Sequence, residues 1–220
     1  MSLRTTGQSQ RYLEILQVEC ARESELIDNL LDLQRLETAY YPIVLEHAVN
    51  LQDCLPSIIE SFQARAQQRE QTIQLNISPN IPPLLMDRAS LERILAELLN
   101  NACKYTLNAG EIVLSVHLKE LGKESSTIFT ISNQAEIPAT ELPRIFDKFY
   151  RVPKADRWKQ GGTGLGLALV QKLVERLQGT IRVDSSDGWT TFTIELFQSI
   201  SEIAEYRGKD SESVTKPFNQ

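Results

Sequence analysis

Apolar and polar residues follow one another in a way that predicts a long amphipathic helix at the start of this chain. Residues 9–37 contain no Gly or Pro, and apolar positions recur there at helical spacing. The apolar stripe consists of Leu13, Leu16, Cys20, Ile27, Leu30 and Leu31. Because such a stripe is unfavourable in water, we expect a partner helix, in a dimer or bundle. The alternative is a helix that packs only on its own domain.

After the break at Pro42, the pattern predicts an α/β domain over residues 43–197 and a polar, frayed tail over 198–220. We expect strands at 43–49, 72–78, 109–121 and 126–133, and a turn at Gly122–Lys123 joins the last two of them. A final hairpin is expected to turn at Asp187–Gly188. Helices are expected at 51–69, 88–105 and about 165–177, with a short one near 139–146 in an otherwise irregular stretch, and 79–87 is expected to be a loop. This order predicts a two-layer α/β sandwich, a mixed sheet with helices on one face.

Composition narrows the possible functions. The chain has 220 residues and a net charge of -6, which argues against nucleic acid as the main partner. It has no apolar run long enough for a membrane segment, and its first residues lack the apolar core of a signal peptide. Its three cysteines, Cys20, Cys54 and Cys103, are widely spaced, so we expect reduced, mostly buried thiols in a cytoplasmic protein.

Candidate chemistry begins in the helix expected at 88–105. Glu97, Asn101, Lys104 and Tyr105 are spaced so that they share one face of that helix, opposite an apolar face. An amide oxygen is a suitable ligand for Mg²⁺, a lysine can pair with phosphate, and an aromatic ring can face a nucleobase. Taken one by one, these side chains could equally form a solvated helix face.

A glycine-rich stretch, "GGTGLGLALV" at 161–170, leads directly into the next expected helix. Ordered glycines cost conformational entropy, so four of them together indicate a backbone that approaches something closely. The N–H groups at the start of the helix suit an anion such as phosphate. A flexible turn before a core helix is the alternative interpretation.

Three motifs resemble those of the sensor histidine kinases of two-component systems. "LERILAELLNNACKYT" resembles the N box, "RIFDKFYR" at 144–151 the F box, and "GGTGLGLALV" the G2 box of that family. The resemblance covers about residues 43–197 and implies a Bergerat-type ATP-binding sandwich. In residues 1–42, the helix expected at 9–37 ends in "LLDLQRLE" and resembles the second helix of the dimerisation and phosphoacceptor hairpin.

The resemblance also implies roles for individual residues. Asn101 would hold Mg²⁺, Lys104 would reach the triphosphate of ATP, Tyr105 would lie against adenine, and Glu97 would orient metal-bound water or polarise the reacting groups. Residues 152–162 would form a lid over the nucleotide. Further nucleotide contacts would come from Arg151, Gly162, Thr163, Gly164, Leu165 and Gly166. Phe146 and Phe149 would anchor the lid through hydrophobic contacts, with plain core packing a close alternative.

The G1 box departs from the family pattern. The corresponding stretch is "SNQAEIP" at 132–138, where Ser132 stands in place of the adenine-binding aspartate and Gln134 and Glu136 replace both glycines. A charge-assisted hydrogen bond is stronger than a neutral one, so we expect ATP affinity about tenfold below that of typical members. Ser132 or Asn133 could substitute in part.

The H box that carries the phosphoacceptor histidine is missing. Only His47 and His117 are present, and neither has H-box neighbours; His117 is expected to be an exposed strand residue. We therefore expect the acceptor to lie upstream of this chain.

The sequence thus predicts the catalytic ATP-binding region of a cytoplasmic sensor histidine kinase that uses ATP and Mg²⁺. Expected partners are a response-regulator receiver domain and, in the full-length protein, a second copy. Two alternatives remain: another ATPase of the same fold, and a degenerate kinase domain that acts as a binding module.

Overall fold

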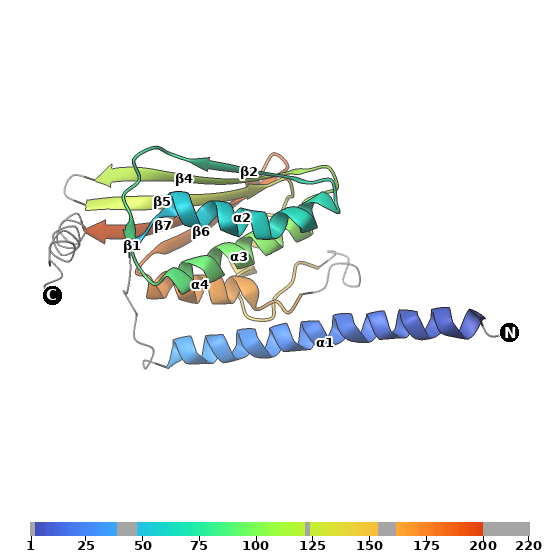
Figure 1. The fold of residues 1–220 in the computed structure, drawn as a ribbon. Coiled ribbons are helices and arrows are strands. Elements are labelled where there is room, and N and C mark those ends of the chain that lie inside the picture. The colour runs from blue at the N-terminus through green and yellow to red at the C-terminus, as the bar shows by residue number, and fades with distance from the viewer. Residues whose placement is uncertain (1–2, 39–47, 122–123, 154–161, 200–220) are drawn as a thin grey trace, which may run out of the picture.

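The chain folds into a main sheet covered on one face by helices, with a long helix lying beneath them (Figure 1). The computed structural model describes residues 3–38, 48–121, 124–153 and 162–199. The helices are α1 (Leu3–Glu37), α2 (Leu51–Gln67), α3 (Arg88–Tyr105) and α4 (Gly166–Arg176), with one 3₁₀ turn, η1 (Leu142–Arg144). The strands are β1 (Ala48–Val49), β2 (Thr72–Ile77), β3 (Leu84–Leu85), β4 (Glu111–Leu121), β5 (Glu124–Asn133), β6 (Thr180–Ser186) and β7 (Trp189–Ser199).

The main sheet is mixed, in the order β2-β4-β5-β7-β6. β2 pairs with β4 in parallel, and all other neighbours in this sheet are antiparallel. The β6–β7 hairpin turns at Asp187 and Gly188, whose φ angles of 53° and 79° match a two-residue turn with left-handed central residues. These findings confirm the predicted two-layer α/β sandwich.

Some expected elements differ from the structure. Of the strand expected at 43–49, only Ala48–Val49 is described; it pairs with β3 in a separate two-stranded sheet, so the loop expected at 79–87 contains a short strand. The helix expected near 139–146 is only η1, whose 3 residues are fewer than one α-helical turn. His47, the Gly122–Lys123 turn and the tail beyond residue 199 lie outside the described residues. His117 is an exposed residue of β4, as expected.

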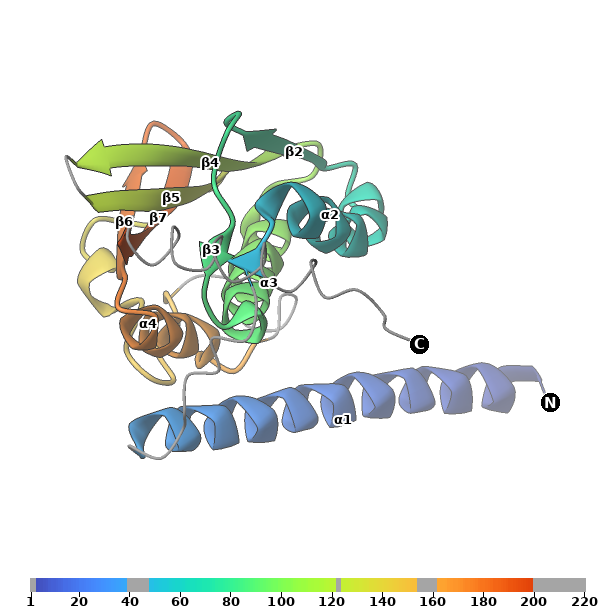
Figure 2. The ribbon, with the colours of Figure 1, turned by 60° about the vertical axis from the view of Figure 1, so that its left-hand side comes forward.

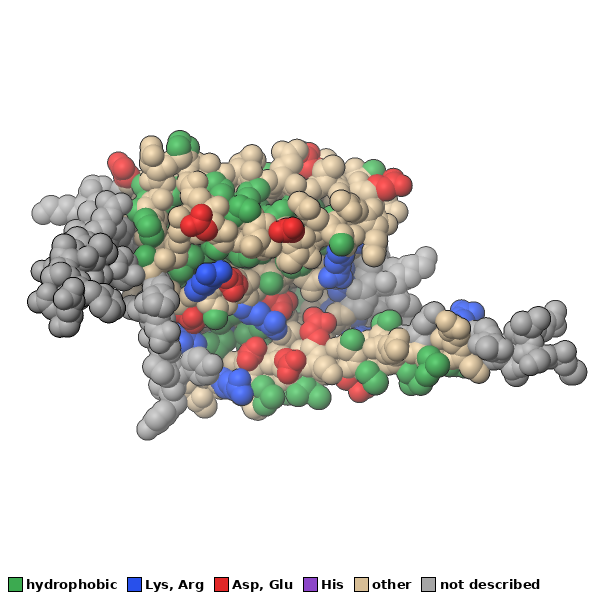
Figure 3. Space-filling model, in the orientation of Figure 1, with side chains coloured by type: hydrophobic (Ala, Val, Ile, Leu, Met, Phe, Trp, Pro, Cys, Tyr) green, Lys and Arg blue, Asp and Glu red, His purple; other side chains and the backbone are tan. Residues whose placement is uncertain are grey.

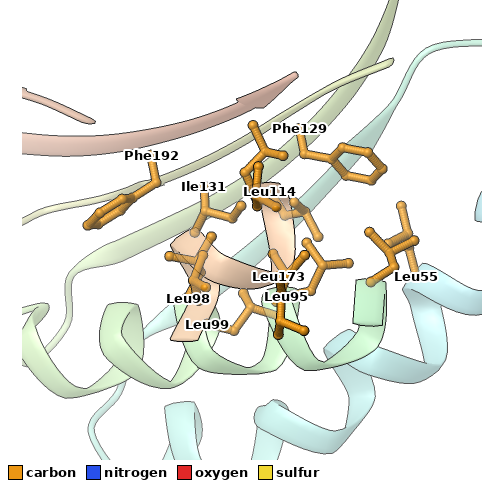
Figure 4. Packing of buried hydrophobic residues seen from close by; sticks show 14 of the residues in the cluster. Leu55, Leu95, Leu98, Leu99, Leu114, Phe129, Ile131, Leu173 and Phe192 are labelled. Atoms are coloured by element: carbon orange, nitrogen blue, oxygen red, sulfur yellow. The ribbon is translucent and has the colours of Figure 1, made fainter. Parts of the chain in front are cut away.

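The hydrophobic core lies between the sheet and the helix layer (Figure 4). α3 contributes Leu95, Leu98 and Leu99, all at most 1% exposed, and β5 contributes Phe129 and Ile131 from alternate positions. Cys54 and Cys103 are also buried, whereas Cys20 is exposed, and all three thiols are free. In the described part of the chain, no helix combines the length and the apolar character that a membrane crossing requires.

α1 contacts the domain through its C-terminal half and projects beyond it at its N-terminal end (Figures 1 and 2). Its buried face consists of Asn29 and Leu33, with Leu26 and Leu36 partly buried. The predicted apolar stripe lies elsewhere on the helix and stays exposed: Leu13 and Leu16 are both 59% exposed. Figure 3 shows apolar side chains along that outer side of α1. The partner helix expected for this stripe remains a prediction.

Candidate functional site

A cavity of about 550 Å³ opens where the C-terminal half of α3 meets the loop after β5 and the glycine-rich segment before α4. Residues from α1, the F-box region and β7 complete its wall. The lining residues that bear on its chemistry are Glu25, Glu97, Asn101, Lys104, Tyr105, Asn133, Arg151, Gly162, Thr163, Gly164, Gly166 and Thr190. Most residues singled out in the sequence therefore meet around one hollow.

The polar face of α3 forms one side of this cavity. Asp87 caps the helix by accepting a hydrogen bond from Ala89 N, and the buried leucines fix the rotation of the helix against the sheet. That rotation presents Glu97, Asn101, Lys104 and Tyr105 to the cavity together. The helical spacing read from the sequence is sufficient to explain this arrangement.

Glu97 is the most enclosed charged group of the site, with 8% of its surface exposed. Burial raises the pKa of its carboxyl group, and the Arg93 guanidinium, 3.2 Å from Oε1, opposes that rise. A Cβ atom at position 166 would lie 2.6 Å from Glu97 Oε2. Gly166 therefore allows the carboxylate to reach the start of α4.

Lys104 and Arg151 give the cavity its positive charge. Burial, and then the repulsion of Arg151, lower the pKa of Lys104 to about 8. Lys104 Nζ lies 4.9 Å from the centroid of the Tyr105 ring, and a Cβ atom at Gly162 would collide with Nζ. Because an anion would relieve the repulsion between the two cations, this end of the cavity is suited to phosphate.

The glycine-rich segment brings backbone close to the site. Gly162 and Gly164 have positive φ angles, of 117° and 73°, and a Cβ atom at Gly164 would lie 2.8 Å from the Phe149 carbonyl carbon. α4 then begins at Gly166, which lines the cavity, and the first N–H groups of a helix have no acceptor within it. Of the expected lid, residues 154–161 lie outside the described part of the chain.

Leu165 requires a correction. Its side chain is 0% exposed and belongs to the hydrophobic core, so it does not line the cavity. Its backbone N–H already donates to Thr163 Oγ1 at 3.3 Å, so it is not free to donate to a ligand. Leu165 holds the start of α4 against the core, whereas Thr163 lines the cavity.

The assignment of Ser132 is also corrected by one position. Successive side chains of a strand point to opposite faces, and Ser132 faces away from the helices, where its hydroxyl lies 2.8 Å from Thr191 Oγ1. Asn133 faces the cavity instead, is 4% exposed, and donates from Nδ2 to Thr106 Oγ1 at 3.1 Å. Its amide oxygen is a hydrogen-bond acceptor on the β5 side of the cavity.

The loop that lacks the G1 glycines is held by other means. Glu111 N donates to the Gln134 side chain at 3.0 Å, and Ile137 N donates to Ser185 Oγ at 2.8 Å. No residue of 134–138 has a positive φ angle, so the backbone there does not require glycine.

The two F-box phenylalanines differ in what they contact. Phe146 packs against the core and meets Phe192 edge to face, with ring centroids 6.4 Å apart. The Phe149 side chain is 58% exposed, so the expectation of a hydrophobic anchor is wrong for this residue. Its backbone N–H donates to Gly164 O at 2.9 Å, and this bond ties the F box to the glycine segment.

Glu25, Thr190 and Phe192 are among the lining residues that the sequence reasoning missed. Glu25 comes from α1, and no sequence pattern indicates that this helix reaches the cavity. Thr190 and Phe192 come from β7, where alternation from Ile194 toward the turn would have placed them on the helix-facing side.

A metal would have to be shared with a bound ligand. Among the described residues, no three His, Cys, Asp or Glu side chains gather as a metal site. Asn101 and Glu97 supply hard oxygen donors at the cavity, and Mg²⁺ is commonly held by one or two such groups together with phosphate oxygens. The residues present fit Mg²⁺ delivered with a nucleotide.

Comparison with known proteins gives consistent matches. The family described as "Histidine kinase-, DNA gyrase B-, and HSP90-like ATPase" matches residues 86–200. Sensor histidine kinase WalK of Bacillus subtilis is 30% identical over 188 residues, which cover 84% of this chain and 30% of WalK. Histidine protein kinase SaeS of Staphylococcus aureus is 31% identical over 186 residues, which cover 83% of this chain and 52% of SaeS.

Solved structures agree with these matches. Full-length ShkA in complex with AMPPNP superposes with a TM-score of 0.73 and 25% identity, covering 87% of this chain and 39% of ShkA. Histidine kinase AdeS of Acinetobacter baumannii gives a TM-score of 0.66 and 25% identity, covering 83% of this chain and 80% of AdeS. The chain spans about a third to a half of the length of the curated relatives named above.

Proposed function

Because this chain belongs to the histidine kinase-, DNA gyrase B- and HSP90-like ATPase family, we propose that it is the catalytic, ATP-binding region of a two-component sensor histidine kinase. The whole protein would transfer the γ-phosphoryl group of ATP to a histidine outside this chain, and then to an aspartate of a response-regulator receiver domain. The observation that carries the proposal is the single cavity that Asn101, Lys104 and the start of α4 share.

The proposed nucleotide site divides the work among the lining residues. Asn101 and Glu97 would hold Mg²⁺, which would supply positive charge against the phosphates of the nucleotide. Lys104 and Arg151 would bind phosphate oxygens, and Gly162, Thr163, Gly164 and Gly166 would let backbone N–H groups approach them. Tyr105 would lie against adenine, whose amino group would donate to the Asn133 amide oxygen. The protein's part in the transfer is positioning and charge stabilisation.

The proposal extends to partners and location. The exposed apolar stripe of α1 supports a helical partner, which we assign to the hairpin of a homodimer. The receiver domain follows from the class of kinase, and we place the activity in the cytoplasm, where ATP is available. The net charge of -6 gives no support to a nucleic-acid partner.

A thermal-shift assay with and without Mg-ADP tests the nucleotide site directly. We expect the melting temperature to rise, because ligand that binds only the folded state stabilises it by mass action. No shift with Mg-ADP or Mg-ATP would favour the binding module. Steady ATP hydrolysis that Glu97→Ala abolishes would favour another ATPase of this fold.

Because the acceptor is expected upstream, we also expect no acid-labile phosphate on this chain after incubation with Mg-ATP.

Asn133→Asp should tighten Mg-ADP binding by about fivefold to tenfold, because an ionised acceptor replaces a neutral one opposite the adenine amino group. The Thr106 hydroxyl, which accepts from Asn133 here, can donate to the new carboxylate. Isothermal titration calorimetry measures the change. Ser132→Asp is the matched control, since this strand neighbour faces the other side of the sheet and should leave the affinity unaltered. If Ser132→Asp tightened binding and Asn133→Asp did not, Ser132 would be the adenine contact instead.

A further inference from the structure

α1 is joined to α3 by a buried amide. Asn29 is 0% exposed, and its Oδ1 accepts a hydrogen bond from Arg93 Nη2. Asn29 Nδ2 and Arg93 Nε are buried at the same contact and have no hydrogen-bond partner in the structure. Unsatisfied buried polar groups cost free energy. A well-packed apolar contact would avoid this cost.

The same guanidinium nitrogen also holds a residue of the nucleotide site. Arg93 Nη2 lies 3.2 Å from Glu97 Oε1, one helical turn along α3. Glu97 in turn reaches Gly166 at the start of α4. A continuous chain of contacts therefore runs from the buried face of α1, through Arg93, to the edge of the cavity where Mg²⁺ is proposed to bind.

Arg93 is the nearby charge that favours the ionised form of Glu97. Arg93 favours the ionised carboxylate, whereas Glu25 and Asp32, both on α1, oppose it, and α4 contributes backbone at Gly166. Charged side chains of both signs gather where α1 meets the helix layer (Figure 3). Glu25, Asn29 and Asp32 are spaced to share one face of α1. Docking of α1 therefore brings two acids toward Glu97 together with the amide that orients its cationic partner.

We propose that Arg93 is a positioning residue for Glu97, and that Asn29 fixes Arg93, so that the magnesium side of the nucleotide cavity responds to the placement of α1. This inference rests on the proposed function of the cavity. Arginine suits the task because a terminal guanidinium nitrogen carries two N–H donors, so Nη2 can donate to the amide and to the carboxylate at once. A shift or rotation of α1 that withdraws Asn29 would free the guanidinium, and Glu97 would lose its fixed orientation.

The test is a double-mutant cycle on the whole chain, with a non-hydrolysable ATP analogue titrated in Mg²⁺ and, separately, in EDTA. Arg93→Met should weaken binding in Mg²⁺ by roughly tenfold, the usual effect of losing an outer partner of a metal ligand. Binding in EDTA should change by less than about twofold, because Arg93 does not contact the nucleotide. Asn29→Ala should weaken Mg²⁺-dependent binding in the parent chain and have no further effect in the Arg93→Met background.

Two further variants sharpen the result. Arg93→Lys keeps a cation beside Glu97 and should bind in Mg²⁺ almost as tightly as the parent chain. This variant leaves Asn29 in place, so its result does not depend on whether Asn29→Ala disturbs the packing of α1. Arg88→Met is the matched control. Arg88 precedes Arg93 on α3 and makes the same kind of ion pair, with its Nε 2.6 Å from Glu92 Oε1, but neither residue of that pair lines the cavity. It should leave both affinities unchanged.

Equal losses in Mg²⁺ and EDTA would mean that Arg93 only supports the fold, and additive effects of Asn29→Ala would break the link to α1. Either result would overturn this inference and leave the proposed function in place. Failure of the unaltered chain to bind the analogue with Mg²⁺ would overturn both.

Discussion

Asn101→Ala is expected to weaken Mg-ADP binding by about a hundredfold or more, to the limit of detection, without unfolding the chain. Asn101 lines the cavity from the polar side of α3, and its amide oxygen is the proposed ligand of Mg²⁺. Without it, Mg²⁺ would have only Glu97 among the proposed protein ligands, and Glu97 is held partly by Arg93. Calorimetric titration measures the loss.

The fold should tolerate this change. Asn101 lies within α3, where alanine has the higher helix propensity, so the free energy of unfolding should change by no more than about 1 kcal/mol. Asn108→Ala, an exposed amide just beyond the helix, serves as a control and should bind as the parent does. Retained Mg-ADP binding by Asn101→Ala would refute the role of this residue.

Lys104→Gln is expected to weaken Mg-ADP binding by about tenfold to a hundredfold near pH 7, because a charge-assisted contact with phosphate is lost. The unaltered chain should also show a pH dependence. Burial and Arg151 lower the pKa of Lys104 to about 8 in the free protein, and a bound phosphate would raise it again.

The sign of that dependence follows from proton uptake. Binding takes up a proton wherever free Lys104 is neutral, so affinity is full below about pH 8 and falls as the pH rises above it. The limiting slope is about tenfold per pH unit. Lys104→Arg is the matched variant, since arginine stays charged throughout this range and should give a flat profile. A profile in the parent chain as flat as that of Lys104→Arg would remove Lys104 from the phosphate site.

Much of the candidate site could be predicted from the local pattern of apolar, polar and glycine residues. The side chains on the polar face of α3 depend only on helical spacing and on an apolar face opposite, and both are visible in the sequence. The glycines before α4 were equally readable, because their positive φ angles and close approaches are properties of glycine itself. Phe149 was misjudged because its backbone, rather than its ring, makes the contact with Gly164.

Strand residues near the G1 stretch were harder to place. A shift of one position exchanges the two faces of a strand, so Ser132 and Asn133 cannot be told apart until the neighbouring strands fix which face meets the helices. Leu165 was misassigned for a related reason, since a residue between two cavity-lining glycines can still turn its side chain into the core.

The sequence by itself determined the sandwich, the helix that carries Asn101 and Lys104, and the glycine-led start of α4, because each depends on periodicity within a short segment. Only the tertiary structure decided that Asn133 faces the cavity, that Glu25 lines it, and that Asn29 meets Arg93. These contacts join segments far apart in the chain, and their geometry follows from how whole helices and strands pack, which no local pattern encodes.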